Sequence, residues 1–312
     1  MTAVEPAPTT VRERRTVSAR ATIGAYVSLM KLRVVELLLI TTVPAMVLAQ
    51  RGLPPLGLTI VTLVGGTLAA GSAHAFNQVL ERDIDAVMHR TRRRPVARAV
   101  VSPTSAFLFA SVLLVLAVVL MLLWVNPLAA ALTALANLFY VYVYTVVLKR
   151  RTAQNIVWGG VAGCLPTMIG WSAVTGSLDW PPVLLFLIVF FWTPPHYWPL
   201  AMRYREDYAR AGIPMLPVVA SARTVAVQIL LYSAAMVVTS LALWPVASLG
   251  WIYGLAAVLA GIWFLAEAWR LHRRAIADES GASLGAMRVF HGSITYLTVV
   301  CVGVMADVLI LG

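Results

Sequence analysis

The sequence predicts an all-α polytopic membrane protein, and three observations carry that prediction. Hydrophobic residues make up 60% of the 312 residues and charged residues only 12%, and the mean hydropathy is +0.84. Apolar runs of about 20 residues recur along the chain, which is the length that a helix needs to cross a hydrocarbon core of about 30 Å. Because lipid offers no partner for backbone polar groups, such long runs must span as helices rather than as barrel strands.

Nine runs qualify as transmembrane helices. They cover residues 34–50, 57–76, 104–124, 127–148, 155–175, 182–202, 224–244, 249–269 and 289–310. The short connections leave no room for a separate soluble domain, so residues 25–312 are expected to form a single transmembrane domain. Residues 1–24 are rich in proline and arginine, and they are expected to form a disordered cytoplasmic tail.

The basic residues set the orientation. With the N-terminus in the cytoplasm, all of the 24 Lys and Arg residues except Arg51 lie on the cytoplasmic side, as the positive-inside rule requires. The C-terminus then lies outside, and the net charge of +11 needs no nucleic-acid partner. Glu5 and Glu13 argue against a mitochondrial transit peptide, so a bacterial plasma membrane is expected. Cys164 and Cys301 fall inside predicted spans and imply no disulfide framework.

The densest charge lies in AFNQVLERDIDAVMHRTRRRP, residues 75–95, at the cytoplasmic end of the second span. If the helix continues, Asn77, Glu81 and Asp85 follow one another at four-residue intervals and share one face, whereas Asp83 points to the other side. Carboxylate and amide oxygens suit Mg²⁺, which takes one or two protein carboxylates and completes its shell with water and substrate phosphates. These three residues, here called the oxygen stripe, are the predicted metal site.

Arginines follow the oxygen stripe at positions 90, 92, 93, 94 and 98. Guanidinium groups bind phosphate oxygens bidentately, so acids that hold a metal beside arginines that hold phosphate describe a diphosphate cradle. A structural alternative stays open, because arginines at the cytoplasmic end of a span are expected from topology alone, and acids on a helix surface often only balance them. Acids are nevertheless concentrated here and in a second cytoplasmic loop that contains Glu206 and Asp207.

Two further cytoplasmic segments carry candidate side chains. In LKRRTAQN, residues 148–155, Lys149 and Arg150 are either span anchors or phosphate ligands, while Asn155 opens the fifth span. Small residues and Pro166 follow, and they predict close helix packing or an irregular cavity wall. The second segment, MRYREDYARAGIPMLP over residues 202–217, faces the same side of the membrane. The two acidic loops are therefore able to meet over one cavity, although spacing alone does not place them together.

At these residues the chain resembles the UbiA superfamily of intramembrane prenyltransferases. The superfamily pattern of Asn, an acid and Asp at four-residue intervals matches Asn77, Glu81 and Asp85. Within the superfamily, ERDID followed by M.RT..RP resembles the protoheme IX farnesyltransferase family. So do KRRTAQNIVWGGVAGCLPTMIGW from residue 149 and WTPPHYWPLAMRYREDYARAGIPMLP from residue 192. The resemblance implies nine transmembrane helices around a lipid-accessible central cavity.

The resemblance also implies a reaction and a set of roles. Such enzymes use Mg²⁺ to hold farnesyl diphosphate and promote loss of diphosphate. In the haem branch, the resulting allylic cation joins the 2-vinyl group of protoheme IX with addition of water, which gives haem O. The oxygen stripe then supplies the metal ligands and catalytic residues, with Asp207 as a further catalytic residue. The implied diphosphate ligands are Arg90, Arg94, Lys149, Arg150, Asn155 and Arg203. The implied partners are farnesyl diphosphate, protoheme IX, membrane lipid and a downstream haem A synthase.

Two positions in the later motif bear on these roles. Many superfamily members carry two aspartates four residues apart, but the position four residues before Asp207 is Arg203, which argues against a second metal site. Asp207 is expected either to bind metal through water or to orient Arg203 and Arg210 on the diphosphate. His196 belongs to the resemblance and is expected to contact haem or to handle a proton. Pro194 and Pro195 are predicted to break the helix and open it to a pocket.

Two other functions stay open. A UbiA-type prenyltransferase of aromatic acids, acting in quinone synthesis, predicts the same fold and oxygen stripe, although ERDIDAVMHRTRRRP and DYARAGIPMLP favour haem. A secondary transporter would also have many spans, but it would carry ionisable groups near the middle of the membrane and an internal repeat. Since the acids here lie at one interface, the transporter is the weaker alternative.

Overall fold

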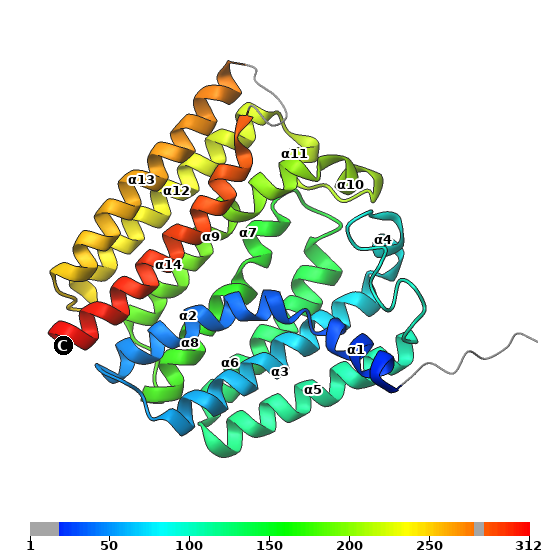
Figure 1. The fold of residues 1–312 in the computed structure, drawn as a ribbon, viewed down its shortest axis with the longest axis horizontal. Coiled ribbons are helices and arrows are strands. Elements are labelled where there is room, and N and C mark those ends of the chain that lie inside the picture. The colour runs from blue at the N-terminus through cyan, green and yellow to red at the C-terminus, as the bar shows by residue number, and fades with distance from the viewer. Residues whose placement is uncertain (1–18, 278–283) are drawn as a thin grey trace, which may run out of the picture.

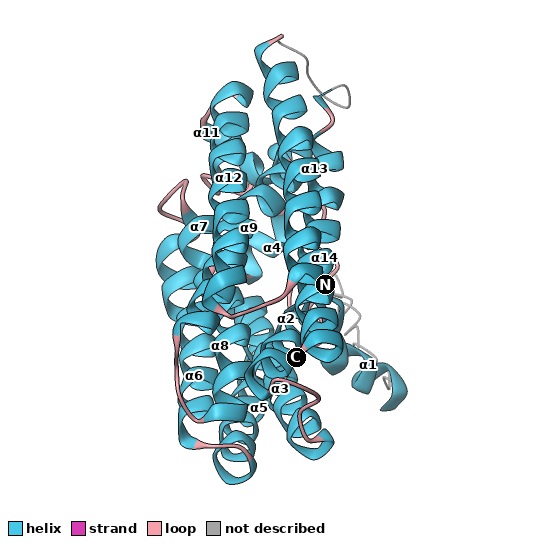
Figure 2. Ribbon diagram, turned by 90° about the vertical axis from the view of Figure 1, so that its left-hand side faces the viewer, coloured by secondary structure: helices cyan, strands magenta, loops and turns pink. Residues whose placement is uncertain are grey.

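A computed structural model describes residues 19–277 and 284–312. The described residues form helices and loops, with no strand among them (Figure 2). The long elements are α2 (Leu32–Gln50), α3 (Leu56–Leu80), α5 (Pro103–Trp124), α6 (Pro127–Leu138) continued by the π-helix η1 (Phe139–Leu148), α8 (Val161–Thr175), α9 (Trp180–Arg203), α12 (Ala222–Val246), α13 (Trp251–Ile276) and α14 (Ala286–Leu311). The short ones are α1 (Ala19–Leu29), α4 (Arg82–Val87), α7 (Asn155–Gly159), α10 (Arg205–Arg210) and α11 (Leu216–Val219).

The membrane spans agree with the predicted ones. Within the described residues, eight helical spans are long and apolar enough to cross a membrane, with α6 and η1 forming one of them and α7 and α8 another. The ninth predicted span corresponds to α2, in which Ile40–Gln50 is apolar but shorter than the others. The prediction of an all-α polytopic membrane protein is therefore confirmed.

The predicted tail ends too late. Residues 1–18 lie outside the described residues, but residues 19–24 belong to α1, so the expected boundary at residue 24 is wrong. The reason is tertiary packing. Leu29 is fully buried, and the ring of Tyr26 packs edge-on against Phe109 of α5 at a centroid distance of 5.0 Å. These contacts hold α1 on the bundle.

Small residues let the spans approach closely. A Cβ atom added at Gly170 of α8 would lie 2.5 Å from the carbonyl oxygen of Thr42 in α2, and one added at Gly71 of α3 would lie 2.6 Å from the Cε atom of Met30. Helices in membranes associate largely through such close backbone packing, because lipid provides little hydrophobic drive between them. In the small-residue stretch of the fifth span, a Cβ atom added at Gly160 would lie 3.0 Å from the Thr193 side chain of α9. Of the two predicted alternatives, close helix packing is therefore the one that this glycine shows.

The helices form two groups joined by α2 and α8. Helices α9, α12, α13 and α14 pack together, α3 packs along α5, and α2 packs along α8 (Figure 1). The short helices α4 and α10 lie beside each other at one end of the bundle, where the acidic loops of both sequence motifs come together (Figure 1).

Helix α9 runs without a break through Pro194, Pro195 and Pro199, so the predicted helix break is wrong. Proline removes a backbone donor, but transmembrane helices tolerate this where neighbouring helices cover the freed groups. Here α9 packs tightly on α12 and α14. The indole Nε1 of Trp192 also donates to the carbonyl oxygen of Ser293 in α14 at 2.7 Å.

Candidate active site

The oxygen stripe lies where α3 meets α4. The regular helix ends at Leu80, Glu81 has φ −109° and ψ 15°, and α4 begins at Arg82, so the helix does not continue as one regular segment. Asn77, Glu81 and Asp85 are nevertheless all buried, with exposed fractions of 2%, 1% and 1%. The side chain of Asp83 is 60% exposed. Despite the interruption, the three stripe side chains are buried together while Asp83 is exposed, as the four-residue spacing predicts.

Both buried carboxylates are paired with cations. Lys149 Nζ donates to Glu81 Oε2 at 2.6 Å, and Arg94 Nη1 lies 2.7 Å from each carboxylate oxygen of Asp85. The second oxygen of Glu81, Oε1, is buried and has no hydrogen-bond partner. Since buried polar atoms are normally satisfied, Oε1 has the capacity to accept a bond from an additional donor or to bind a cation.

Asn77 brings a third cation to the stripe. Its Oδ1 atom accepts from Lys31 Nζ at 3.4 Å, and its Nδ2 atom donates to Thr145 Oγ1 at 3.3 Å. Burial lowers the pKa of Lys31 well below its ordinary value, and the nearby Arg94 lowers it further. Sequence reasoning missed Lys31, because a lysine just before a span is the expected interfacial anchor.

The π-helix η1 positions Thr145 and Lys149 toward the stripe. The backbone N–H of Lys149 donates to the carbonyl oxygen of Tyr144 at 2.9 Å, five residues earlier, and Thr145 Oγ1 donates to the carbonyl oxygen of Tyr140 at 3.0 Å. Lys149 Nζ also lies 6.0 Å from the centroid of the Tyr144 ring, within the range of a cation–π contact. π-helical turns are uncommon and are frequent at functional sites.

Asp207 joins the two acidic loops through their backbones. Its carboxylate accepts from the backbone N–H of His89 at 3.4 Å and of Arg90 at 3.2 Å, and it pairs with Arg210. Burial acts to raise the pKa of Asp207, but the Arg90 N–H and the Arg210 guanidinium outweigh burial, so the pKa lies below its ordinary value. Asp207 thus pairs with Arg210, whereas no hydrogen bond or ion pair between Asp207 and Arg203 occurs in the described part of the chain.

Arg90 contacts tyrosines of the second acidic loop, whereas Asn155 is bonded locally. Arg90 Nη2 donates to the hydroxyl of Tyr208 at 3.4 Å, and its guanidinium carbon lies 5.9 Å from the centroid of the Tyr204 ring. Asn155 is fully buried at the start of α7, where its Nδ2 atom donates to the Thr152 carbonyl oxygen at 2.7 Å. The other side-chain atom, Asn155 Oδ1, is buried without a partner.

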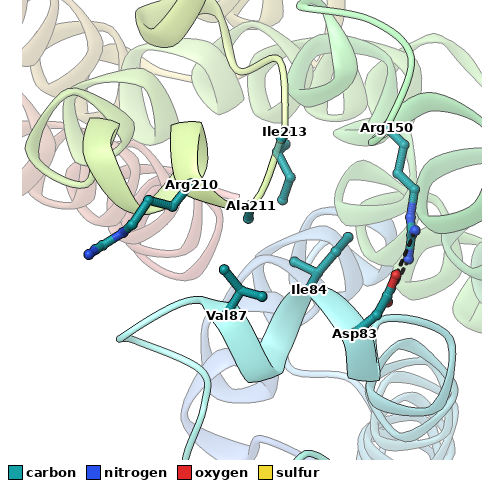
Figure 3. Close-up of a pocket in the computed structure, with 8 residues that line it drawn as sticks. Asp83, Ile84, Val87, Arg150, Arg210, Ala211 and Ile213 are labelled. Atoms are coloured by element: carbon teal, nitrogen blue, oxygen red, sulfur yellow. Dashed lines mark hydrogen bonds and ion pairs between the residues drawn. The ribbon is translucent and has the colours of Figure 1, made fainter.

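Arg150 lies outside the stripe. It binds both carboxylate oxygens of Asp83 at 2.9 and 2.8 Å, and hydrogen bonding to Arg150 lowers the pKa of Asp83. Figure 3 shows this pair at the edge of a cavity of about 310 Å³ between α4 and the segment after α10. The cavity is lined by Asp83, Ile84, Val87, Arg150, Arg210, Ala211, Gly212 and Ile213. It lies on the side of α4 that carries Asp83, and among the described residues Arg150 makes no hydrogen bond or ion pair with a stripe acid.

Arg203 lines a different cavity, of about 780 Å³. Arg205 and Arg288 lie in the same lining, together with residues from α11, α12 and the start of α14. Neither Glu81 nor Asp85 belongs to this lining. The structure therefore does not bring Arg203 to the oxygen stripe, because the end of α9 directs it toward the α12 and α14 side.

His196 is buried between α9 and α14, with 8% of its surface exposed. Its ring stacks between Trp192 and Phe290, and its Nδ1 atom lies 2.9 Å from Ser293 Oγ. His74, in α3, contacts Tyr140 instead, with a distance of 3.5 Å between His74 Nδ1 and the Tyr140 hydroxyl. The two histidines thus occupy separate environments.

The donor set of the stripe suits a hard cation. Within residues 19–277 and 284–312, no group of three or more His, Cys, Asp and Glu side chains is positioned to hold a metal. Two carboxylates and one amide are available instead, and the unpartnered Glu81 Oε1 offers an open ligand position. Mg²⁺ is commonly held by one or two carboxylates with water and substrate phosphates completing its shell. The stripe fits that mode of binding.

Sequence comparison shows the family of the chain. The UbiA prenyltransferase family matches residues 38–294. A "Protoheme IX farnesyltransferase" of a Nocardioides species is 56% identical over 295 residues, which cover 95% of this chain and 94% of the relative. A protein of the same name from Frankia alni is 58% identical over 284 residues, covering 91% of this chain and 97% of the relative.

Solved structures show the same fold. A structure described as digeranylgeranylglyceryl phosphate synthase aligns with a TM-score of 0.75 and 16% identity, covering 92% of this chain and 98% of that one. A UbiA homologue from Archaeoglobus fulgidus bound to DMAPP and Mg²⁺ aligns with a TM-score of 0.62 and 16% identity, covering 90% and 99%. These structures show the fold, and the family match together with the sequence relatives establishes that the chain belongs to the UbiA prenyltransferase family.

Proposed function

We propose that this protein is a Mg²⁺-dependent intramembrane prenyltransferase that converts farnesyl diphosphate, protoheme IX and water into haem O and diphosphate. The bond between C1 of farnesyl and the diphosphate oxygen breaks, and the terminal carbon of the 2-vinyl group bonds to C1. Water adds to the inner vinyl carbon and releases a proton to solvent. The observation that carries the proposal is the buried oxygen stripe, in which cations already lie beside each acid. The relatives named for protoheme IX farnesylation support the choice of substrates.

Asn77, Glu81 and Asp85 would hold the metal ion. Bound there, Mg²⁺ would supply positive charge that stabilises the departing diphosphate. Burial of all three side chains strengthens this effect, because charges interact more strongly away from bulk water. The solved UbiA homologue bound to DMAPP and Mg²⁺ supports the choice of metal.

Lys149, Arg94 and Lys31 are placed to hold the diphosphate. Each lies within 3.4 Å of a stripe side chain, so a phosphate group next to the stripe would meet all three cations. Arg90 and Asn155 are the further proposed ligands of the diphosphate. The unpartnered Asn155 Oδ1 would accept a bond from a water or from a protonated phosphate oxygen.

The acceptor and the membrane placement follow from the same proposal. His196 is the proposed contact for protoheme IX.

The reaction occurs at the cytoplasmic rim of a bacterial plasma membrane, because the stripe lies on the side that carries the basic residues. A cavity open to the bilayer, as the family resemblance implies, would admit a prenyl chain and limit the water that would quench an allylic cation. The product would pass to a haem A synthase.

The decisive experiment is a turnover assay with the purified protein in nanodiscs. Protoheme IX, farnesyl diphosphate and Mg²⁺ are supplied, and the extracted porphyrins are identified by mass spectrometry, with EDTA and Asp85→Asn as controls. Hydroxyethylfarnesyl haem that depends on Mg²⁺ and on Asp85 is the expected result. If haem stays unmodified while an aromatic acid is prenylated, the quinone-pathway alternative replaces the haem assignment. If neither acceptor reacts, the proposed enzyme activity is wrong.

A further inference from the structure

The imidazole of His196 is stacked between two aromatic rings. The Trp192 ring lies parallel to it at a centroid distance of 4.1 Å and an interplanar angle of 15°. The Phe290 ring covers the other face at 4.6 Å and 26°. Since neither face is open, only the edge of the imidazole, with its two nitrogen atoms, is able to meet a ligand.

One of those nitrogens is committed to Ser293. His196 Nδ1 lies 2.9 Å from Ser293 Oγ, and Ser293 Oγ lies 2.7 Å from the carbonyl oxygen of Phe290. A carbonyl oxygen is an acceptor only, so the single hydroxyl proton of Ser293 is used in that second bond. Ser293 Oγ must therefore accept from Nδ1–H, which fixes the neutral imidazole as the tautomer protonated on Nδ1.

The other nitrogen, Nε2, then carries a free lone pair. No hydrogen bond to Nε2 occurs in the described ranges, although the side chain is more than nine-tenths buried. The backbone of Ser293 is itself anchored, because its carbonyl oxygen accepts from Trp192 Nε1 at 2.7 Å. Ser293 therefore makes two contacts that bear on His196. Its carbonyl oxygen bonds Trp192, whose ring stacks on the imidazole, and its hydroxyl bonds the imidazole itself.

We propose that Ser293 is a positioning residue that presents His196 Nε2 as an axial ligand to the iron of the tetrapyrrole acceptor. This inference rests on the proposed function, since it concerns how that site binds its acceptor. A histidine that binds metal through one nitrogen usually donates the N–H of the other to a fixed acceptor, which sets the tautomer and raises the basicity of the ligating nitrogen. The hydroxyl of Ser293 supplies that acceptor here.

The test is a titration of the full-length protein in nanodiscs with ferric protoheme IX, followed by absorbance and electron paramagnetic resonance. His196→Ala is expected to remove the signature of imidazole-ligated iron. Ser293→Ala is expected to weaken ferric haem binding by about tenfold to a hundredfold, which is typical when a partner of a metal ligand is removed. Ser293→Thr keeps the hydroxyl and is expected to restore binding and spectrum.

Two controls separate ligation from packing. Metal-free protoporphyrin IX has no iron to ligate, so its affinity is expected to be the same for wild type and Ser293→Ala. Ser233→Ala removes an equally buried serine hydroxyl, which bonds only within α12, and it is expected to leave both titrations unchanged. If Ser293→Ala leaves ferric haem binding intact, or weakens both porphyrins equally, the inference is overturned.

The inference and the proposed function fail in different ways. If wild type forms haem O and His196→Ala keeps the wild-type iron spectrum, the inference falls and the proposed function stands. If wild type neither binds nor converts protoheme IX, the proposed function falls, and the inference falls with it.

Discussion

Lys149 Nζ lies 2.6 Å from Glu81 Oε2, and this contact joins the end of η1 to the junction of α3 and α4. The two side chains are 15% and 1% exposed. Burial lowers the pKa of Lys149, and the proximity of Glu81 opposes that decrease. Removing one partner of such a buried pair leaves the other charge uncompensated. The variants tested at this site must therefore separate lost chemistry from lost structure.

Asp85→Asn is expected to lower turnover by about a hundredfold or more, the size of effect seen when one group that stabilises transition-state charge is removed. Asparagine keeps the shape of the side chain and one acceptor for Arg94, so the fold is expected to survive. Turnover in nanodiscs and the thermal unfolding temperature are measured together. A variant that is fully folded and fully active would contradict a metal role for Asp85.

The matched control is Asp83→Asn. Asp83 lies two residues earlier, is 60% exposed and pairs with Arg150, which is 44% exposed. Exposed ion pairs contribute only about 0.2–1 kcal/mol to stability. Turnover is therefore expected to change by less than about threefold. Equal losses of turnover in the two variants would indicate that Asp85→Asn acts through the loss of a negative charge in this region and not through the loss of a metal ligand.

Lys31→Gln is expected to weaken binding of a prenyl diphosphate analogue by about tenfold or more, because a hydrogen bond to a charged group contributes about 1.5–3 kcal/mol. Affinity is measured by equilibrium titration with an analogue that does not ionise. Arg51→Gln serves as the control, since Arg51 bonds the Ala247 carbonyl oxygen at the opposite end of the bundle. Unchanged affinity in Lys31→Gln would remove Lys31 from the proposed diphosphate site.

Asp207 predicts a pH-dependent contact between the two acidic loops. Its folded-state pKa is depressed, so its contribution to stability is present above the unfolded-state pKa and is lost as pH falls through the folded-state value. Hydrogen exchange at the amides of His89 and Arg90 is expected to accelerate below the ordinary aspartate range. Asp207→Asn should show fast exchange already at neutral pH, with no further acid step, whereas Glu206→Gln, at an exposed position, should behave as wild type.

Gly170→Ala is expected to destabilise the protein by about 1–3 kcal/mol, the usual cost of overpacking. The added Cβ would lie 2.5 Å from the Thr42 backbone, which is unable to rotate away as a flexible side chain would. Thermal unfolding in detergent provides the measurement. Gly57→Ala is the control, because nothing lies within 4 Å of a Cβ at that position, and alanine is the better helix former. Equal unfolding temperatures for the two variants would refute close packing of α2 on α8.

The spans and the oxygen stripe were predictable because both depend on local periodicity. Hydrophobic length locates a helix, and a four-residue interval places Asn77, Glu81 and Asp85 together even where α3 gives way to α4. The exposure of Asp83 follows from the same interval. Local patterns of this kind survive the interruption at Glu81, because four-residue backbone hydrogen bonds from Glu81 to Asn77 and from Asp85 to Glu81 are kept across it.

Long-range partners were less predictable. Lys31 reaches Asn77 across 46 residues of sequence, and its position before a span favours the simpler interpretation as an anchor. Arg203 was expected at the diphosphate because of its place in the motif, yet it lines the cavity that also contains Arg288. The effect of Pro194 depends on α12 and α14, which cover the helix around it. Each of these outcomes is set by tertiary packing that no single segment encodes.

Because η1 is a π-helix, its turn geometry sets the direction in which Lys149 leaves the helix, and so whether Lys149 reaches Glu81. In an α-helix, residues five apart are separated by about 140° around the axis, whereas in η1 the wider turn bonds Lys149 to Tyr144 and lets its side chain contact the Tyr144 ring. Deleting one residue between 139 and 148, or tightening this segment into an α-helix, would rotate Lys149 away from Glu81 without altering either residue. The activity of this protein should thus be sensitive to the length of a segment that contains no Asp, Glu, His, Lys or Arg of its own.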